Sequence, residues 1–518
     1  MKSSKARMGG MDGRMTKGFR VLLVYPSLFM QTGLPLGISS LAAALKEKGI
    51  EVKVFDTVFY QLPGDVDENV ERATVHRSFK LFDYRSLGVV KNDSDMFDDF
   101  TKTLAEYEPD LIGLSSMECI FERGLKLTRL AKELMDVPVI AGGIFASLAP
   151  EVVIEEGSID MVCIGEGEDA LVELCECLRD GNDHSGIKSL WVKKNGKVMK
   201  NALARLRSLD EVVKPDFSVF DPRMFYKPMQ GNLFKTIPIE ITRGCPYRCT
   251  YCAAPSLNRL YKNSGKDGYF REKSMSNLFS EIKESIEKYS PEFFYFASET
   301  FLAINNDTFN EFIERYKEIK VPFWIQTRVE TVTYERIRKL QDVGLFWLTI
   351  GVEHGNEGYR NKYLKRYTKN EKTIEVVKIL DKCDQGASLN NIIGLPFETR
   401  ELIYETIMFN RELFKINDRL KSNVSIFTPY KGCELYDLCV SNKLLDPVPY
   451  TNHTNIIGDL PLKSDLLTPE EINGLFRTFN LYVYLPDEYL DRIRSAESFT
   501  PEGNKEFESL NEKVGEYL

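Results

Sequence analysis

Three cysteines are clustered in one short stretch of the sequence, at Cys245, Cys249 and Cys252. Thiolates are the preferred protein ligands of iron–sulfur clusters. A four-iron cluster has four corners, so three cysteines leave one iron open to a substrate or cofactor. A zinc site would need a fourth cysteine or histidine nearby, and the closest later histidine, His354, lies far along the chain. The spacing therefore predicts an iron–sulfur cluster with one open iron.

The elements around these cysteines predict a barrel. A β-branched strand at 236–242 leads directly into them, and five more strands follow, separated by amphipathic helices. The later strands are expected at 293–296, 322–327, 345–353, 387–393 and 423–427, and the helices at 274–289, 305–319, 332–343, 370–384 and 399–417. Six βα units predict a partial (β/α)6 barrel of the TIM type, with its site at the carboxyl ends of the strands.

Polar residues at these strand ends are candidate site residues. Glu299 follows the second strand, Arg328 the third and Glu353 the fourth. The alternative for an acidic residue at such a position is that it caps the next helix.

Strands and helices also alternate between residues 18 and 180. Five apolar runs predict a flavodoxin-like or Rossmann-like parallel sheet, which binds ligands at the carboxyl ends of its strands. No G-x-G-x-x-G follows the first strand, so a dinucleotide is disfavoured. The loops at the strand ends supply the candidate binding residues, which are Thr32, Leu34, Pro35, Leu36, Gly37, Ser115, Ser116, Glu118, Gly142, Gly143, Gly165, Glu166 and Gly167.

The cysteine motif C-x3-C-x2-C, with Tyr251 before its last cysteine, resembles the signature of the radical S-adenosylmethionine superfamily. The resemblance implies a 4Fe-4S cluster whose open iron chelates S-adenosylmethionine. Reductive cleavage then gives a 5′-deoxyadenosyl radical. Tyr251 is expected on the adenine side. I-G-V-E-H-G, around Glu353, resembles the family segment for the ribose and amino-acid parts. I-I-G-L-P-F-E-T resembles the adenine segment, and its carriers are Ile392, Gly394, Leu395, Pro396 and Glu398.

The N-terminal loops resemble the cobalamin-binding domain that precedes many radical S-adenosylmethionine domains. Related cobalamin domains carry a histidine that ligates cobalt, but none of the strand-end loops here contains one, and His76 lies in an acidic insertion. The resemblance therefore implies base-off cobalamin without a histidine ligand.

Together the two resemblances imply a cobalamin-dependent (class B) radical S-adenosylmethionine enzyme. Most relatives of this kind are methyltransferases that act on an unactivated carbon by way of methylcobalamin. Cyclisation, C–C coupling or ring rearrangement with the same cofactors remains an alternative. A non-catalytic cobalamin-binding or electron-transfer protein is an alternative of another class, although electron carriers usually complete their cluster ligation.

The composition indicates which partners and which cellular compartment to expect. The net charge of −9, without a basic stripe, argues against a nucleic-acid binder, and no apolar run could span a membrane. Ten cysteines without a secretory signal indicate a reducing, cytoplasmic compartment. We expect an external flavodoxin- or ferredoxin-type electron donor and a small-molecule, lipid or peptide substrate that the sequence does not identify.

Five segments are expected along the chain. They are a disordered basic leader at 1–17, a cobalamin-binding domain at 18–180, a linker with a small hairpin at 181–235, the barrel at 236–430, and a helical segment that shapes the substrate pocket at 431–518. The roles of His354 and Cys433, which stand where the family has other residues, are left open.

Overall fold

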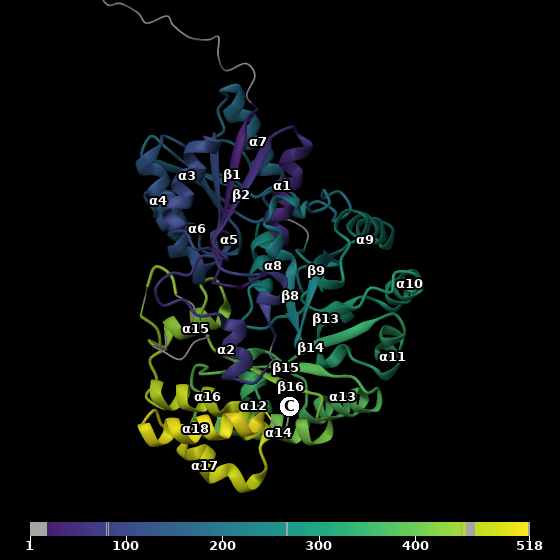
Figure 1. Cartoon of the computed structure of the whole chain (residues 1–518). Helices are drawn as coiled ribbons and strands as arrows, with labels where there is room; N and C mark the ends of the chain where they lie inside the picture. Colours follow the sequence, from purple (N-terminus) through teal and green to yellow (C-terminus); the bar gives the residue numbers. More distant parts are fainter. Residues whose placement is uncertain are drawn as a thin grey trace, which may run out of the picture.

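The computed structural model describes residues 18–78, 80, 82–265, 268–446, 448–451 and 462–515, so the expected leader at 1–17 lies outside the described residues. Figure 1 shows an α/β layer in purple and blue at the top, a curled sheet in teal and green in the middle, and yellow helices at the bottom. The predicted fold class is confirmed: a Rossmann-like domain, a partial barrel and a helical C-terminal segment.

The N-terminal sheet has seven strands among the described residues, in the order β2-β1-β3-β4-β5-β6-β7. They are β1 Arg20–Tyr25, β2 Glu51–Asp56, β3 Leu111–Ser115, β4 Val139–Gly142, β5 Met161–Cys163, β6 Leu190–Lys194 and β7 Lys197–Lys200. The first five are parallel, as predicted. The hairpin expected in the linker pairs antiparallel with β5, so the sheet continues past residue 180.

Helices cover both faces of this sheet. Val21 and Leu23 of β1 pack towards α1 and α7, whereas Leu22 and Val24 pack towards α3 to α6. A strand buried on both faces reads as a continuous apolar run, which is why β1 could be found from sequence. The covering helices are α1 Leu36–Glu47, α3 Met96–Tyr107, α4 Phe121–Leu134, α5 Ile144–Leu148, α6 Pro150–Glu155 and α7 Glu168–Asp180, whereas α2 Glu68–Thr74 lies beside the half barrel (Figure 1).

The second sheet is the half barrel, in the order β16-β15-β14-β13-β12-β9-β8. Its strands are β8 Tyr226–Met229, β9 Asn232–Glu240, β12 Phe293–Ala297, β13 Phe323–Arg328, β14 Leu345–Glu353, β15 Ala387–Ile393 and β16 Lys421–Ile426. Neighbours from β9 to β16 are parallel, as the six predicted units require. β8 is an additional strand. It forms a hairpin with β9 because Gln230 and Gly231, both at positive φ, make a tight turn.

Helices surround the half barrel and close its β16 end. They are α8 Ala254–Asn263, α9 Met275–Tyr289, α10 Asn306–Tyr316, α11 Tyr334–Asp342, α12 Glu357–Tyr359, α13 Asn370–Lys382, α14 Arg400–Ile416, α15 Glu434–Ser441, α16 Pro469–Tyr484, α17 Leu490–Ser495 and α18 Pro501–Val514. α16 begins with a capping box of Thr468 and Glu471 and packs on α14 and β16. Asn480 of α16 donates to the carbonyls of His76 and Ser422, which ties the N-terminal insertion to the barrel edge.

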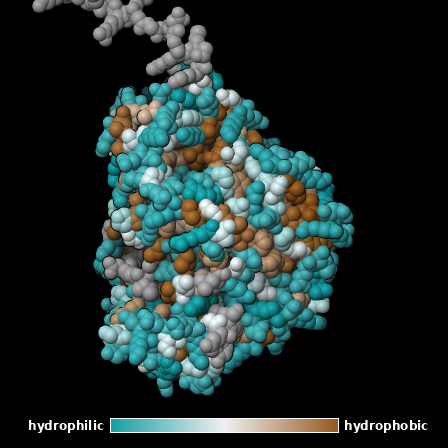
Figure 2. All heavy atoms as spheres, viewed as in Figure 1, coloured by the Kyte–Doolittle hydropathy of each residue, from teal (hydrophilic) through white to brown (hydrophobic). Residues whose placement is uncertain are grey.

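The surface in Figure 2 is mainly hydrophilic on the face shown, with apolar patches interrupted by polar side chains. No helix in the described part of the chain combines the length and the apolar character needed to cross a bilayer.

Candidate active site

The three cysteines lie on one loop between β10 (Thr242–Arg243) and α8. Cys245 and Cys249 are buried and Cys252 is partly exposed. Gly244 begins the loop at φ +91°, and a Cβ there would lie 3.1 Å from the backbone of Phe270, so glycine is required at this position. The loop is therefore fixed by close packing at the end of the strand.

Two side chains from neighbouring strand ends contact the thiols. Arg328 donates from Nη1 to Cys249 Sγ at 3.0 Å, and Thr300 Oγ1 lies 3.6 Å from Cys245 Sγ. Arg328 also stacks 3.9 Å above the ring of Tyr247 and pairs with Glu330. Donors aimed at a sulfur stabilise its thiolate, so Arg328 serves the cysteine loop directly.

The donor set fits an iron–sulfur cluster. Burial raises the pKa of Cys252 to about 12, with further contributions from the Cys249 and Cys245 thiols, so the three sulfurs lie near one another. Within the described ranges, no three cysteine, histidine or carboxylate groups lie close enough to hold a single metal ion. A cubic cluster spreads its ligands farther apart than one ion does, so three thiols on one loop can serve a cluster without forming a site for a single ion.

A buried arginine that the sequence did not single out joins two predicted residues. Arg366 Nη1 lies 3.2 Å from both Tyr251 Oη and Glu353 Oε1, and Nη2 donates to the carbonyl of Gly351. Glu353 adopts φ +70° at a bulge in β14, and its carboxylate occupies the space that a side chain on residue 351 would need. A polar cluster is thereby held at the strand end beside the cysteine loop.

The predicted adenine segment is fixed at the end of β15. Gly394, at φ +72°, and Pro396 line a cavity of about 280 Å³ that Phe427 and Ile472 also border, and Ile392 packs in the same apolar cluster as Tyr251. Thr399, rather than Glu398, caps α14. The capping alternative for Glu398 is therefore wrong, since its carboxylate bonds His354 and the amide of Leu395 instead.

A second cavity, of about 370 Å³, lies at the carboxyl edge of the N-terminal sheet. Eight of the predicted loop residues line it: Leu36, Gly37, Ser115, Gly142, Gly143, Gly165, Glu166 and Gly167. Gly143 has φ +103°, and a Cβ there would lie 2.9 Å from the carbonyl of Ser116; a Cβ on Gly165 would collide with Tyr261. These glycines keep the loops close together around an open space.

The barrel supplies the opposite wall of this cavity through Glu240, Arg243, Tyr269 and Glu299. Glu299, a candidate site residue at the end of the second barrel strand, lines the cavity of the cobalamin loops, one residue before Thr300. Its carboxyl is accessible from the cleft yet surrounded by protein, and this desolvation raises its pKa to about 7. The cavity and the cysteine loop are therefore adjacent.

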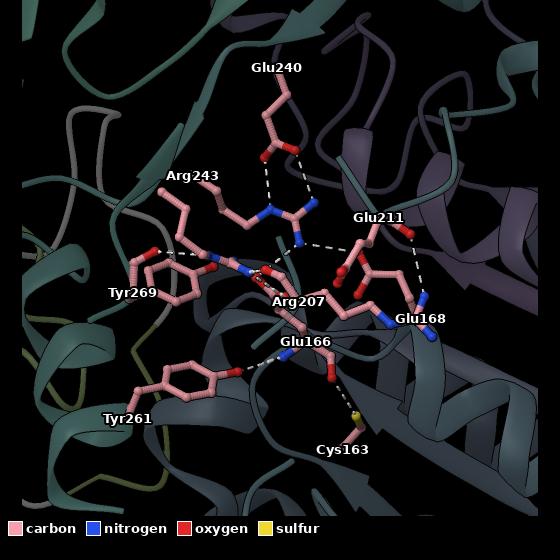
Figure 3. A network of polar contacts seen from close by, with 10 residues as sticks. Cys163, Glu166, Glu168, Arg207, Glu211, Glu240, Arg243, Tyr261 and Tyr269 are labelled. Atoms are coloured by element: carbon pink, nitrogen blue, oxygen red, sulfur yellow. Dashed lines mark hydrogen bonds and ion pairs between the residues drawn. The ribbon is translucent and has the colours of Figure 1, made fainter. Parts of the chain in front are cut away.

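Figure 3 shows the ion-pair network that holds the two domains together at this wall. Arg243 pairs with Glu240 at 2.9 Å, Glu166 at 3.0 Å and Glu168 at 3.2 Å, and the amide of Glu166 donates to Tyr261 Oη at 3.0 Å. Because Arg243 lies two residues before Cys245, the network ties the G-E-G-E loop to the cysteine loop.

Five predicted residues lie outside this cavity. Thr32, Leu34 and Pro35 line a larger cavity inside the barrel. Ser116 donates to the carbonyl of Gly142 at 2.8 Å. Glu118 accepts from the amides of Lys431 and Thr451, at 2.8 and 2.9 Å, and so anchors the C-terminal segment.

Cys433 is buried at the start of α15, and burial, followed by the nearby Cys252 thiol, raises its pKa to about 12. Cys433 thus lies beside the cysteine loop.

Comparisons with known proteins agree with this architecture. The model of the B12 binding domain matches residues 29–175, and that of the Radical SAM superfamily matches residues 239–409. Over 491 residues the chain is 26% identical to an uncharacterized methyltransferase, PH0819, of Pyrococcus horikoshii, covering 92% of this chain and 94% of that protein.

Two further likenesses help to place the chain. It is 26% identical to an anaerobic magnesium-protoporphyrin IX monomethyl ester cyclase of Cereibacter sphaeroides, over 73% of this chain but only 60% of the cyclase. The fold resembles that of TsrM from Kitasatospora setae, a radical S-adenosylmethionine methyltransferase solved with cobalamin and a 4Fe-4S cluster bound. The TM-score is 0.62 and the identity 16%, covering 97% of this chain and 100% of that one. With a B12 domain and a three-cysteine barrel joined at one cleft, the chain belongs to the cobalamin-dependent radical S-adenosylmethionine enzymes.

Proposed function

We propose that this enzyme transfers a methyl group to an unactivated carbon of its substrate. The observation that carries the proposal is the adjacency of the two cofactor sites. Glu299 lines the cavity of the cobalamin loops, and the next residue, Thr300, lies 3.6 Å from Cys245 Sγ. A carbon placed between them would be within reach of both hydrogen abstraction and methyl donation, and such positioning is the protein's share of cofactor chemistry.

Cys245, Cys249 and Cys252 would hold the 4Fe-4S cluster, which supplies reductive cleavage of S-adenosylmethionine. Arg328 stabilises the Cys249 thiolate, and Arg366 holds the carboxylate of Glu353 and the hydroxyl of Tyr251 in place. We propose that this fixed cluster orients the amino-acid and ribose parts of S-adenosylmethionine, while the loop at Gly394 and Pro396 receives the adenine.

The loops at the sheet edge would hold cobalamin, which supplies the methyl carrier. Between the glycine loops the cavity is lined by apolar side chains of Leu23, Ile38, Leu41, Ile140 and Leu171. This apolar lining would suit the heteroaromatic end of a cobalamin tail detached from cobalt. No histidine borders the cavity in the described part of the chain. Both features support the base-off form without a histidine ligand.

The share of each relative that aligns with this chain favours methyl transfer over ring formation. The match covers 94% of the methyltransferase PH0819 but 60% of the cyclase. None of the ten cysteines forms a disulfide in the described part of the chain, which supports a reducing, cytoplasmic setting. An external flavodoxin- or ferredoxin-type protein would supply the electron.

The test is an anaerobic reaction of reconstituted enzyme with cobalamin, S-adenosylmethionine and a low-potential reductant, with both products quantified by mass spectrometry. A methyltransferase forms S-adenosylhomocysteine as well as 5′-deoxyadenosine, and Cys252→Ala forms no deoxyadenosine. Deoxyadenosine with no S-adenosylhomocysteine would favour ring formation or rearrangement. Neither product, from enzyme with a full cluster and bound cobalamin, would count against the proposal.

A further inference from the structure

The barrel encloses a cavity of about 550 Å³ to which none of the proposed cofactors is assigned. Its walls are inward-facing residues of β9 and β12 to β16, and its mouth is bordered by the loop at Thr32–Leu36 and by the β8–β9 hairpin. Leu36 also lines the cavity of the cobalamin loops, so the two spaces adjoin. We infer that this cavity binds a substrate with a planar apolar body and an anionic group, and that Lys227 holds the anion.

The charges of the two cavities are opposite in sign. Among the described residues, the barrel cavity is lined by Lys227 and Arg72 and by no carboxylate. Carboxylates dominate the neighbouring cavity, which is lined by Glu166, Glu168, Glu240 and Glu299 beside Arg243. An anion entering the cleft is therefore attracted to the barrel and repelled from the cobalamin loops.

Lys227 has no anionic partner among the described residues. In the part of the chain that the structure describes, its ammonium makes no hydrogen bond or ion pair, and Nζ lies 6.0 and 5.8 Å from the ring centroids of Tyr295 and Trp324. Burial lowers the pKa of Lys227, and repulsion from Arg72 adds a smaller effect in the same direction. A bound anion would offset this destabilisation of the ammonium. Arg72 lies on α2 near Glu71, so Lys227 is the charge available to a ligand.

Aromatic rings form the adjoining wall. Tyr295 and Trp324 are stacked, with centroids 4.4 Å apart and planes 22° from parallel, and Trp347 follows on the next strand. Both indole N–H groups are already bonded, Trp324 to Thr349 at 3.0 Å and Trp347 to Ser388 at 2.9 Å. These rings are fixed and offer apolar contact to a planar ligand.

The strand wall also carries a buried polar atom that a ligand could bond. Asn423 donates to Asn390 Oδ1 at 3.1 Å, but its own Oδ1 is buried without a hydrogen bond among the described groups. Buried polar atoms are rarely left unbonded, so a hydroxyl or N–H of the substrate would complete this one.

The assignment rests on the proposed function, because it takes this cavity as the substrate's. Three probes share one ring system: 2-naphthoate, 2-naphthyl phosphate and the neutral 2-naphthamide. Equilibrium dialysis measures their binding to anaerobically reconstituted, cobalamin-loaded enzyme. We expect at least one anion to bind about tenfold more tightly than the amide, since a charge-assisted contact contributes at least that much. The preferred anion distinguishes a carboxylate substrate from a phosphate.

Lys227→Met should remove the preference for the anion and leave the affinity for 2-naphthamide unchanged. Lys235→Met is the matched control, a half-buried lysine over Phe225 on the same hairpin, and should bind as wild type does. Three results would overturn the inference: equal or no binding of the three probes by wild type, a preference that survives Lys227→Met, or loss of bound cobalamin from that variant. Dialysis needs no turnover, so an inactive enzyme that still prefers the anion would count against the proposed function alone.

Discussion

His354 Nε2 donates to Glu398 Oε1 across 3.1 Å, and both side chains are completely buried. The direction of the bond follows from the other ring nitrogen, because His354 Nδ1 accepts from the amide of Asn356 at 3.0 Å. The second oxygen of Glu398 accepts from the amide of Leu395 at 2.9 Å. His354 therefore links the end of β14 to the predicted adenine loop, which gives a structural role to a residue whose function the sequence left open.

Removing this link should loosen the adenine loop. We expect Glu398→Ala to destabilise the fold by about 1–3 kcal/mol, because it leaves the buried His354 ring and the Leu395 amide without an acceptor. S-Adenosylmethionine should also bind more weakly. Denaturant unfolding and equilibrium dialysis measure the two effects. Glu401→Gln, on the exposed side of α14, is the control, and equal stability of the two variants would contradict the role given to Glu398.

The features that could be predicted from the sequence depend on residues close together in the chain. The spacing of Cys245, Cys249 and Cys252 and the glycine loops involve residues only a few positions apart, and the structure places both sets at strand ends, where the sequence predicted them. Arg366 was missed because its partner Tyr251 is 115 residues away in sequence. A single turn of π-helix, Arg360–Leu364, precedes Arg366 and brings its side chain to Tyr251. Glu118 follows β3 as predicted, but a short 3-10 turn directs it to the C-terminal segment, a contact that no local pattern reveals.

Arg366 should matter for cofactor binding rather than for cluster assembly. In Arg366→Met the carboxylate of Glu353 loses its partner and Tyr251 loses its donor, so we expect S-adenosylmethionine to bind about tenfold more weakly, as for a lost charge-assisted contact. Iron and sulfide content should equal that of wild type. Lys369→Met, at an exposed position nearby, should change neither quantity. Loss of the cluster in Arg366→Met would show instead that this residue supports the cysteine loop.

The network of Figure 3 predicts a separate effect on cobalamin. Glu166→Gln weakens the pairs with Arg243 and Arg271 that hold the G-E-G-E loop against the barrel. We expect the purified variant to retain less cobalamin, measured by its visible absorbance, while its iron content is unchanged. Glu173→Gln, exposed on α7, is the control and should retain cobalamin as wild type does. Full retention by Glu166→Gln would mean that the loop holds its shape without these pairs.

Lys421, at the start of β16, should make stability depend on pH. Burial lowers its pKa to about 8, whereas the unfolded chain has an ordinary lysine pKa near 10.4. The folded state therefore disfavours the ammonium. The resulting destabilisation is complete below pH 8 and disappears as the pH rises through the unfolded value. Lys421→Met should thus be more stable than wild type by about 3 kcal/mol at pH 7 and equally stable above pH 10.5. Denaturant unfolding at the two pH values measures the difference. The exposed Lys415→Met should show no such pH dependence, and a constant gain for Lys421→Met would indicate better apolar packing instead.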